Sequence, residues 1–184
     1  MFIYKEVTDA KKALLFSAAD YLASVSYPKG NIDLPSVEYD IPAIEKRLKQ
    51  IGFDTVKGEN VNRCEYVSII EESVKTAPAD SIHIVYFTGH GGHYNGKNYI
   101  LPSDFGLRLD ETGKYDDAGI NIEHIISFYK GKGRLILILD ACRAEIGSTK
   151  AYYSEMAKAE NVYIAYDANG ELPISGIMES VIKW

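Results

Sequence analysis

The sequence predicts an α/β domain built around a mostly parallel β-sheet. Segments with strand and helix patterns alternate along the whole chain, which is typical of parallel sheets covered by helices. Leu135–Leu139 is an unbroken apolar run, as expected for a central strand that is buried on both faces. The length of 184 residues and a hydrophobic content of 46% are suited to a single domain over residues 1–184 with a substantial core.

The first half of the chain predicts two strands and two helices. The first helix is indicated by apolar residues at helical spacing, which are Val37, Ile41, Ile44, Leu48 and Ile51. Gly52 follows as a helix C-terminal glycine, and Pro78 follows the second helix. The predicted elements are a strand over 12–17, a helix over 36–51, a strand over 53–56 and a helix over 62–77.

The second half continues the alternation. It predicts strands over 82–87, 99–101, 135–139 and 162–166, and helices over 120–130, 150–158 and 174–183. The longest polar segment, residues 103–118, is predicted to be a loop. The chain ends at Trp184 without a closing strand, which suggests a C-terminally truncated domain or a sheet edge that another chain completes.

Charge and composition exclude several classes of partner. The net charge of −6 and the lack of a basic stripe argue against nucleic acid. No segment approaches the roughly 18 apolar residues that a membrane helix requires, so no membrane partner is expected.

The two cysteines, Cys64 and Cys142, do not form a disulfide framework. They are most simply read as reduced thiols of a cytoplasmic protein, with Cys64 on a helix face.

The segment YFTGHGGHYNGKNY, residues 86–99, admits two interpretations. The first is a phosphate-binding loop over residues 91–98 that would bind a nucleotide. That motif requires Ser or Thr at the position of Asn98, and a helix should follow it. Strand-like residues and Pro102 follow instead, which favours the second interpretation, a catalytic histidine loop around His90.

Cys142 is the candidate partner of His90. Each residue comes directly after a predicted strand, and sites in open α/β sheets form at the carboxyl ends of strands. If the two strands are neighbours, the imidazole can activate the thiol and later protonate a leaving amine. The alternatives are a structural histidine and a buried, inert cysteine. A zinc site with His93 lacks a third ligand, and a tyrosine phosphatase would require an arginine near Ser148.

Several segments, taken in order, resemble the caspase-fold cysteine peptidases of the metacaspase and paracaspase branch. Cys142 lies 52 residues after His90, close to the roughly 50-residue spacing known for caspases. The resemblance implies a three-layer sandwich that normally continues into one further strand, and an oxyanion site formed by the amides of Gly91 and Cys142. The matching segments are KALLFSAADY, VEYDIPAIEKRLKQIGF, IVYFTGHGG, YILPSD, LILILDACR and NVYIAYDANGE.

The same resemblance implies cleavage of protein or peptide substrates after Arg or Lys. Asp140 stands two residues before Cys142, where caspases that cut after aspartate carry glutamine. Asp40 and Glu171 match further pocket acids, and Thr88 should line the same pocket. Carboxylates pair with basic side chains, which fits an anionic pocket. The alternative for Asp40, Asp140 and Glu171 is a helix cap or a surface charge.

The resemblance also suggests activation by calcium, although the chemistry itself requires no cofactor. Asp104, Asp116 and Asp117 are candidate ligands, and their alternative is a solvated loop. Lys150 is a candidate self-cleavage point, and a regulatory partner or fused domain is a further expectation. The competing functional hypothesis is an inactive caspase-fold module that binds or scaffolds other proteins.

Overall fold

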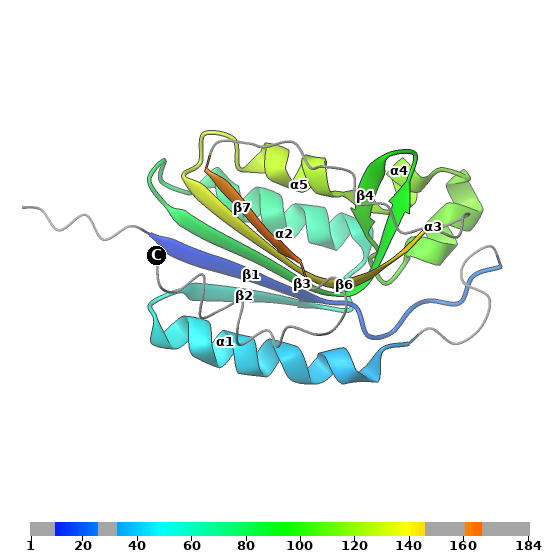
Figure 1. Ribbon diagram of the computed structural model, residues 1–184, viewed down its shortest axis with the longest axis horizontal. Helices are drawn as coiled ribbons and strands as arrows, with labels where there is room; N and C mark the ends of the chain where they lie inside the picture. Colours follow the sequence, from blue (N-terminus) through cyan, green and yellow to red (C-terminus); the bar gives the residue numbers. More distant parts are fainter. Residues whose placement is uncertain (1–9, 26–32, 146–160, 167–184) are drawn as a thin grey trace, which may run out of the picture.

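The computed structural model describes residues 10–25, 33–145 and 161–166. Strands and helices alternate through most of this part of the chain (Figure 1). The strands are β1 (Lys11–Ser17), β2 (Asp54–Glu59), β3 (Ile82–Tyr94), β4 (Lys97–Ile100), β5 (Ile120–Asn121), β6 (Arg134–Glu145) and β7 (Val162–Tyr166). The helices are the 3₁₀ helix η1 (Pro35–Tyr39), α1 (Asp40–Gln50), α2 (Arg63–Lys75), α3 (Phe105–Thr112), α4 (Tyr115–Ala118) and α5 (Ile122–Phe128).

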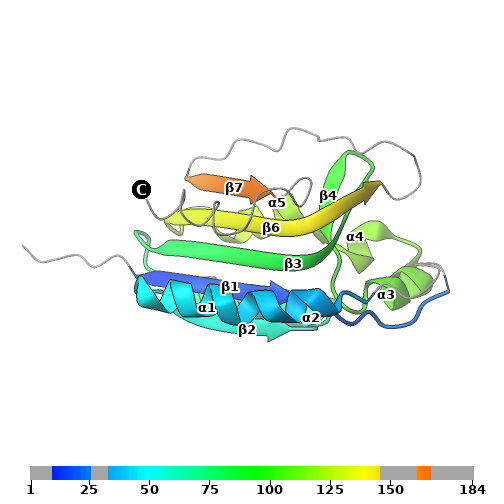
Figure 2. The same cartoon turned by 60° about the horizontal axis from the view of Figure 1, so that its bottom comes forward.

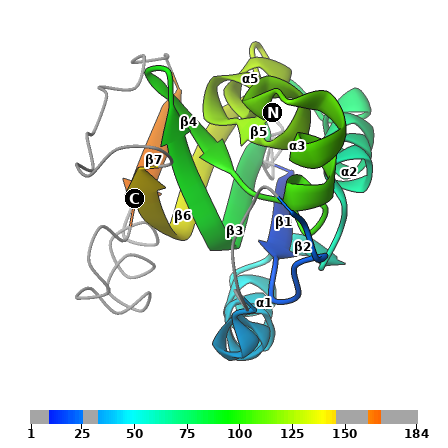
Figure 3. The same ribbon diagram turned by 90° about the vertical axis from the view of Figure 1, so that its right-hand side faces the viewer.

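The sheet is mostly parallel, which confirms the predicted α/β class. Five strands lie in the order β2-β1-β3-β6-β7, and every pair among them is parallel (Figure 2). The short strands β4 and β5 are antiparallel additions. Strand β6 occupies one edge of β3 over almost its whole length, so β1 and β4 share the other edge (Figure 3).

Helices cover both faces of the sheet and form a three-layer sandwich. Helix α1 buries Ile41, Ile44 and Leu48 against one face, in a cluster with Ile84, Tyr86 and Ile138 of the central strands. Helices α2 and α5 cover the other face, where Tyr66, Ile70 and Ile125 pack against Val85, Leu137 and other strand residues. Figure 1 shows α1 on the opposite side of the sheet from α2 and α5.

Local sequence explains where the helices begin. The side chain of Asn62 accepts a hydrogen bond from the Glu65 amide, while the Glu65 carboxylate accepts one from the Asn62 amide. This capping box satisfies two amides that would otherwise lack partners at the start of α2. Pro35 lies at the start of η1, and its fixed φ angle suits the first turn of a helix.

Three sequence-based expectations require correction. Residues 103–118, predicted to be a loop, contain helices α3 and α4, because Phe105 and Ala118 are buried and give these short segments a side to pack. The predicted helix over 36–51 begins as the 3₁₀ helix η1, and α1 starts only at Asp40. The predicted helix over 120–130 begins with the short strand β5. The predicted helices over 150–158 and 174–183 lie outside the described residues.

Candidate active site

His90 and Cys142 lie opposite each other on adjacent parallel strands. Strands β3 and β6 pair without interruption from Ile82 with Arg134 to His93 with Glu145, and this register makes Cys142 the partner of His90. Adjacent strands are separated by about 4.8 Å, so the two residues share one region of the sheet. Both strands continue past these residues, whereas the sequence had placed them just after the strand ends. Figure 1 shows β3 and β6 curving together towards β4.

Tyr21 fixes the backbone at His90. Its hydroxyl accepts a hydrogen bond from the His90 amide at 2.8 Å and donates one to the Leu101 carbonyl at 3.3 Å. The phenol ring also lies against the imidazole, with ring centroids 4.9 Å apart. Tyr21 could not be identified as a site residue from the sequence, because its role depends on contacts between segments that are far apart along the chain.

Gly89 makes this arrangement possible. Its φ angle is +152°, and a Cβ atom there would lie 2.8 Å from the Phe87 ring and 3.0 Å from the Tyr21 hydroxyl. Any side chain at position 89 would therefore displace Tyr21 or Phe87. These contacts explain why a glycine precedes His90, which the sequence motif alone does not explain.

Asp40 and Thr88 come together at the start of α1. The Thr88 hydroxyl, which is buried, donates to Asp40 Oδ2 at 3.4 Å. Burial raises the pKa of Asp40 above its usual value, and the hydrogen bond from Thr88 opposes that shift. Asp40 is held in place because the apolar face of α1 packs on the sheet directly after it. The structure therefore brings these two predicted pocket residues into contact.

Asp140 has a partner on the neighbouring strand. The Tyr86 hydroxyl donates to Asp140 Oδ2 at 3.1 Å, and Tyr86 itself is fully buried. The pKa of Tyr86 is raised far above its usual value, first by burial and then by the negative charges of Asp140 and Asp40. Thr88, which donates to Asp40, is the register partner of Asp140, so the two acids lie on the same side of the sheet as Tyr86.

The oxyanion donors and the third pocket acid stay predictions. Gly91 and Cys142 both lie within paired strands, where backbone amides point towards a neighbouring strand. Gly91 is the register partner of Ile100 in β4 and of Arg143 in β6. Glu171 and Lys150 lie outside the described residues.

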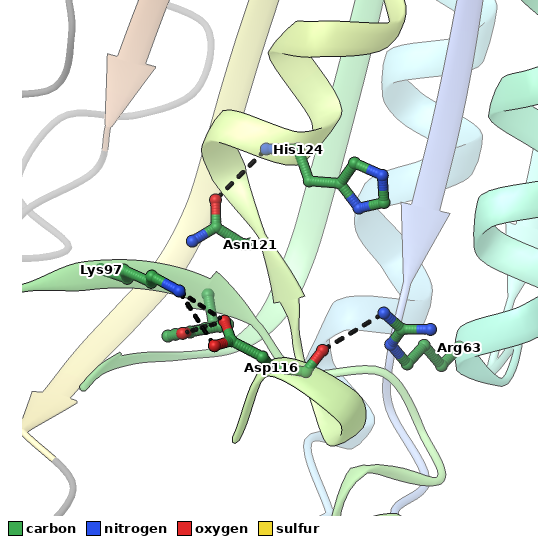
Figure 4. Close-up of polar contacts among 6 residues, drawn as sticks. Arg63, Lys97, Asp116, Asn121 and His124 are labelled. Atoms are coloured by element: carbon green, nitrogen blue, oxygen red, sulfur yellow. Dashed lines mark hydrogen bonds and ion pairs between the residues drawn. The ribbon is translucent and has the colours of Figure 1, made fainter. Parts of the chain in front are cut away.

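The three candidate calcium ligands do not form one group of ligands in the described part of the chain. Asp104 Oδ1 accepts a hydrogen bond from the Arg63 amide at 2.9 Å. Asp116 forms an ion pair with Lys97 at 2.9 Å and accepts a hydrogen bond from Tyr99 at 2.7 Å (Figure 4). Asp117 is exposed. Among the described residues, no cluster of three or more His, Cys, Asp or Glu side chains could hold a metal ion.

A pocket of about 370 Å³ lies beside this network and away from the His90–Cys142 pair. Arg63 lines it and donates to the carbonyls of Gly119 and Asp116. Of the charged groups along the pocket, Lys97 therefore pairs with the Asp116 carboxylate, whereas Arg63 is engaged by backbone carbonyls (Figure 4). The lining residues are Arg63, Lys97, Asp116, Asn121, Glu123 and His124.

Two other histidines, His83 and His124, and the second cysteine, Cys64, lie away from the His90–Cys142 pair. His83 is buried at the start of β3, and His124 is exposed on α5. Cys64 is exposed on α2, in agreement with its assignment to a helix face. No helix in the described ranges is long and apolar enough to cross a membrane.

Comparisons with known proteins agree with the observed fold. The sequence profile described as "Caspase domain" matches residues 10–174. A solved structure with a similar fold is the Drosophila initiator caspase Dronc, which is 12% identical with a TM-score of 0.56. The match covers 84% of this chain and 54% of the Dronc chain, so the present chain spans about half of that protein. No curated protein sequence matches this chain. At this identity the structural match supports the fold alone, whereas the profile covers most of the sequence and shows that the chain belongs to the caspase domain family of peptidases.

Proposed function

We propose that this protein is a cytoplasmic cysteine endopeptidase of the metacaspase and paracaspase type that cuts after Arg or Lys. The observation that carries the proposal is the pairing of β3 with β6, which sets His90 opposite Cys142. Asp40 and Asp140, on the same side of the sheet, supply the negative charge that a basic substrate side chain requires.

In the proposed mechanism, His90 first accepts a proton from Cys142 and then donates a proton to the leaving amine. His90 takes the thiol proton of Cys142, and the resulting thiolate attacks the carbonyl carbon of the scissile bond. The protonated His90 then gives this proton to the leaving amine as the carbon–nitrogen bond breaks, which leaves a thioester on Cys142. Water hydrolyses the thioester, releases the acid product and restores the thiol. Backbone amides near Gly91 and Cys142 are the proposed donors to the oxyanion.

The proposed specificity comes from two carboxylates supplied by two different elements. Asp40 begins α1, and Asp140 belongs to β6, so a basic side chain entering between them contacts acids from both sides. Arginine can pair bidentately with a carboxylate, and lysine offers a compact charge. Because burial raises the pKa of Asp40, its negative charge should be lost at a higher pH than for an ordinary aspartate. Glu171 remains a proposed third acid.

The test is hydrolysis of fluorogenic peptides with Arg, Lys, Asp or Ala before the cut. Each peptide is assayed with calcium and with chelator, using the native chain and the Cys142→Ala variant. We expect cleavage after Arg and Lys only, and complete loss in Cys142→Ala. Calcium-dependent cleavage would support the proposed activation, and equal rates with chelator would contradict it.

The contribution of the pocket is measured separately. Asp40→Asn should reduce kcat/KM for the arginine peptide by about tenfold or more, because a charged partner is lost. Asp54→Asn is the matched control, since it removes one charge from an exposed position on β2. Cleavage after aspartate would contradict the pocket assignment. A folded native chain that cleaves no peptide would contradict the peptidase proposal and favour a binding or scaffold module.

A further inference from the structure

We propose that Tyr86 is a specificity-determining positioning residue that holds the Asp140 carboxylate in place for a basic substrate side chain. This inference rests on the proposed function, because it concerns the same pocket. Tyr86 begins the segment around His90, where the sequence pattern assigns it no role. It acts through Asp140, not through the reacting atoms.

The contact between Tyr86 and Asp140 has a defined direction. The phenol donates to Asp140 Oδ2 at 3.1 Å, and the tyrosine is fully buried. A buried tyrosine hydroxyl requires a hydrogen-bond partner, and an aspartate carboxylate is a strong acceptor. Burial and the two nearby carboxylates raise the pKa of Tyr86, so the phenol keeps its proton and remains a donor at neutral pH.

Strand β3 serves both acids through neighbouring side chains on one face. Tyr86 and Thr88 are two residues apart and therefore point to the same side of the strand. Tyr86 donates to Asp140 on β6, and Thr88 donates to Asp40 on α1. Thr88 is also the register partner of Asp140. Tyr86, Thr88 and Asp140 therefore lie next to one another on this face of the sheet. One strand thus orients carboxylates that come from two other elements.

The expected consequence is a change in substrate binding with little change in chemistry. Without the hydroxyl, the Asp140 carboxylate loses a donor that contributes to fixing its rotamer, and part of its ordering must then occur when the substrate binds. We expect Tyr86→Phe to raise KM for the arginine peptide by about five- to twentyfold. The kcat should stay within about twofold, because the His90–Cys142 pair keeps its register.

The matched control is Tyr99→Phe. Tyr99 is also buried, and its hydroxyl also donates to an aspartate, Asp116 Oδ1, at 2.7 Å. Tyr99 belongs to the antiparallel strand β4 and Asp116 to helix α4, where Asp116 lines the pocket beside Arg63 and Lys97. The variant therefore removes a similar hydrogen bond elsewhere, and its KM should equal that of the native chain. Thermal unfolding of each variant verifies that the protein remains folded.

A double-mutant cycle tests the route through Asp140. If Tyr86 acts by positioning that carboxylate, Tyr86→Phe should have no further effect on KM in the Asp140→Asn background. A KM increase that persists in that background would overturn the proposal. A loss of kcat for the arginine peptide as large as the rise in KM would also overturn it, since it would indicate a general structural defect and not a loss of substrate positioning.

Binding separates failure of this inference from failure of the proposed function. The arginine peptide is titrated calorimetrically into Cys142→Ala and into the Cys142→Ala, Tyr86→Phe double variant, which requires no catalysis. If the double variant binds the peptide more weakly, by a factor similar to the expected rise in KM, the role of Tyr86 is supported even if the native chain proves inactive. Equal binding in both overturns this inference alone. No binding of the arginine peptide to either overturns the proposed specificity and the inference together.

Discussion

Tyr21 connects three segments of the site through one hydroxyl group. It follows β1, yet it binds the His90 amide in β3 and the Leu101 carbonyl after β4. The Leu101 amide in turn donates to the His90 carbonyl at 3.0 Å. The backbone at His90 is therefore held from both sides, and the phenol ring packs against the imidazole.

We predict that Tyr21→Phe slows alkylation of Cys142 by iodoacetamide at neutral pH by about three- to tenfold, because a small displacement of His90 weakens activation of the thiol. The reaction is followed by mass spectrometry in a Cys64→Ser background, since Cys64 is an exposed thiol that would react with the same reagent. Tyr39→Phe is the control, because Tyr39 is 79% exposed. An unchanged rate in Tyr21→Phe would contradict a positioning role.

Among individual residues, the sequence identified those whose chemistry follows from a local pattern. His90 and Cys142 each follow an apolar strand segment, so their shared region of the sheet could be inferred from the sequence, although both strands extend beyond these residues. Asp140 was assigned through the family resemblance. Tyr21 and Tyr86 could not be assigned in this way, since their partners lie 69 and 54 residues away along the chain. A tyrosine within an apolar strand indicates only that its hydroxyl requires some partner.

At the scale of elements, the register between β3 and β6 determines the site, and a tight contact secures it where the two strands begin. The Arg134 amide donates to the Ser81 carbonyl at 2.9 Å. Gly133, just before β6, has a φ angle of +93°, and a Cβ atom there would overlap the backbone of Ser81. Only glycine allows the two strand starts to approach this closely.

We predict that Gly133→Ala lowers the free energy of unfolding by at least ~2 kcal/mol more than Gly131→Ala. Gly131 also has a positive φ angle, but no atom lies within 4 Å of the position that an alanine methyl group would take there. That variant therefore carries the backbone strain without the clash. Urea denaturation followed by circular dichroism measures both. Equal losses in the two variants would show that the contact with Ser81 is unimportant.

The elements were predicted best where burial produces a clear period. The strands β1, β3, β6 and β7 and the helix α2 were found within a few residues of their starts because their apolar patterns are regular. The extensions of β3 and β6 beyond residues 87 and 139 were missed, since glycines and polar residues there give no strand pattern. Their pairing is imposed by the neighbouring strands.

At the scale of the whole molecule, a buried histidine links folding stability to pH. His83 is 2% exposed at the start of β3, and its Nε2 lies 2.6 Å from the Ser81 hydroxyl. Its ring packs against Tyr129 from the α5 side of the sheet, with centroids 4.9 Å apart. Burial lowers the pKa of His83, a hydrogen bond with the Lys132 backbone partly opposes this shift, and the charge of Lys12 adds to it.

The direction of the pH effect follows from this lowered pKa. The unfolded chain binds a proton at His83 near the ordinary pKa of about 6.5, whereas the folded chain binds it only at lower pH. Between these two values the unfolded state holds more protons, so stability rises with pH. The contribution of neutral His83 is complete above pH ~7 and is lost as the pH falls through about 6.5 towards the pKa of the folded state.

We therefore predict that acidification from pH 7.5 to pH 5.5 destabilises the native chain more than it destabilises His83→Gln. The glutamine keeps a polar side chain but cannot take up the proton, so the variant loses this part of the pH dependence even if it is less stable throughout.

Urea midpoints at both pH values measure the effect. His124→Gln is the control, because His124 is exposed on α5 and should leave the pH dependence unchanged. Identical pH dependence in His83→Gln and the native chain would contradict the prediction. Since Ser81 also binds the amide that begins β6, the expected loss would act on the strand pair that holds His90 opposite Cys142.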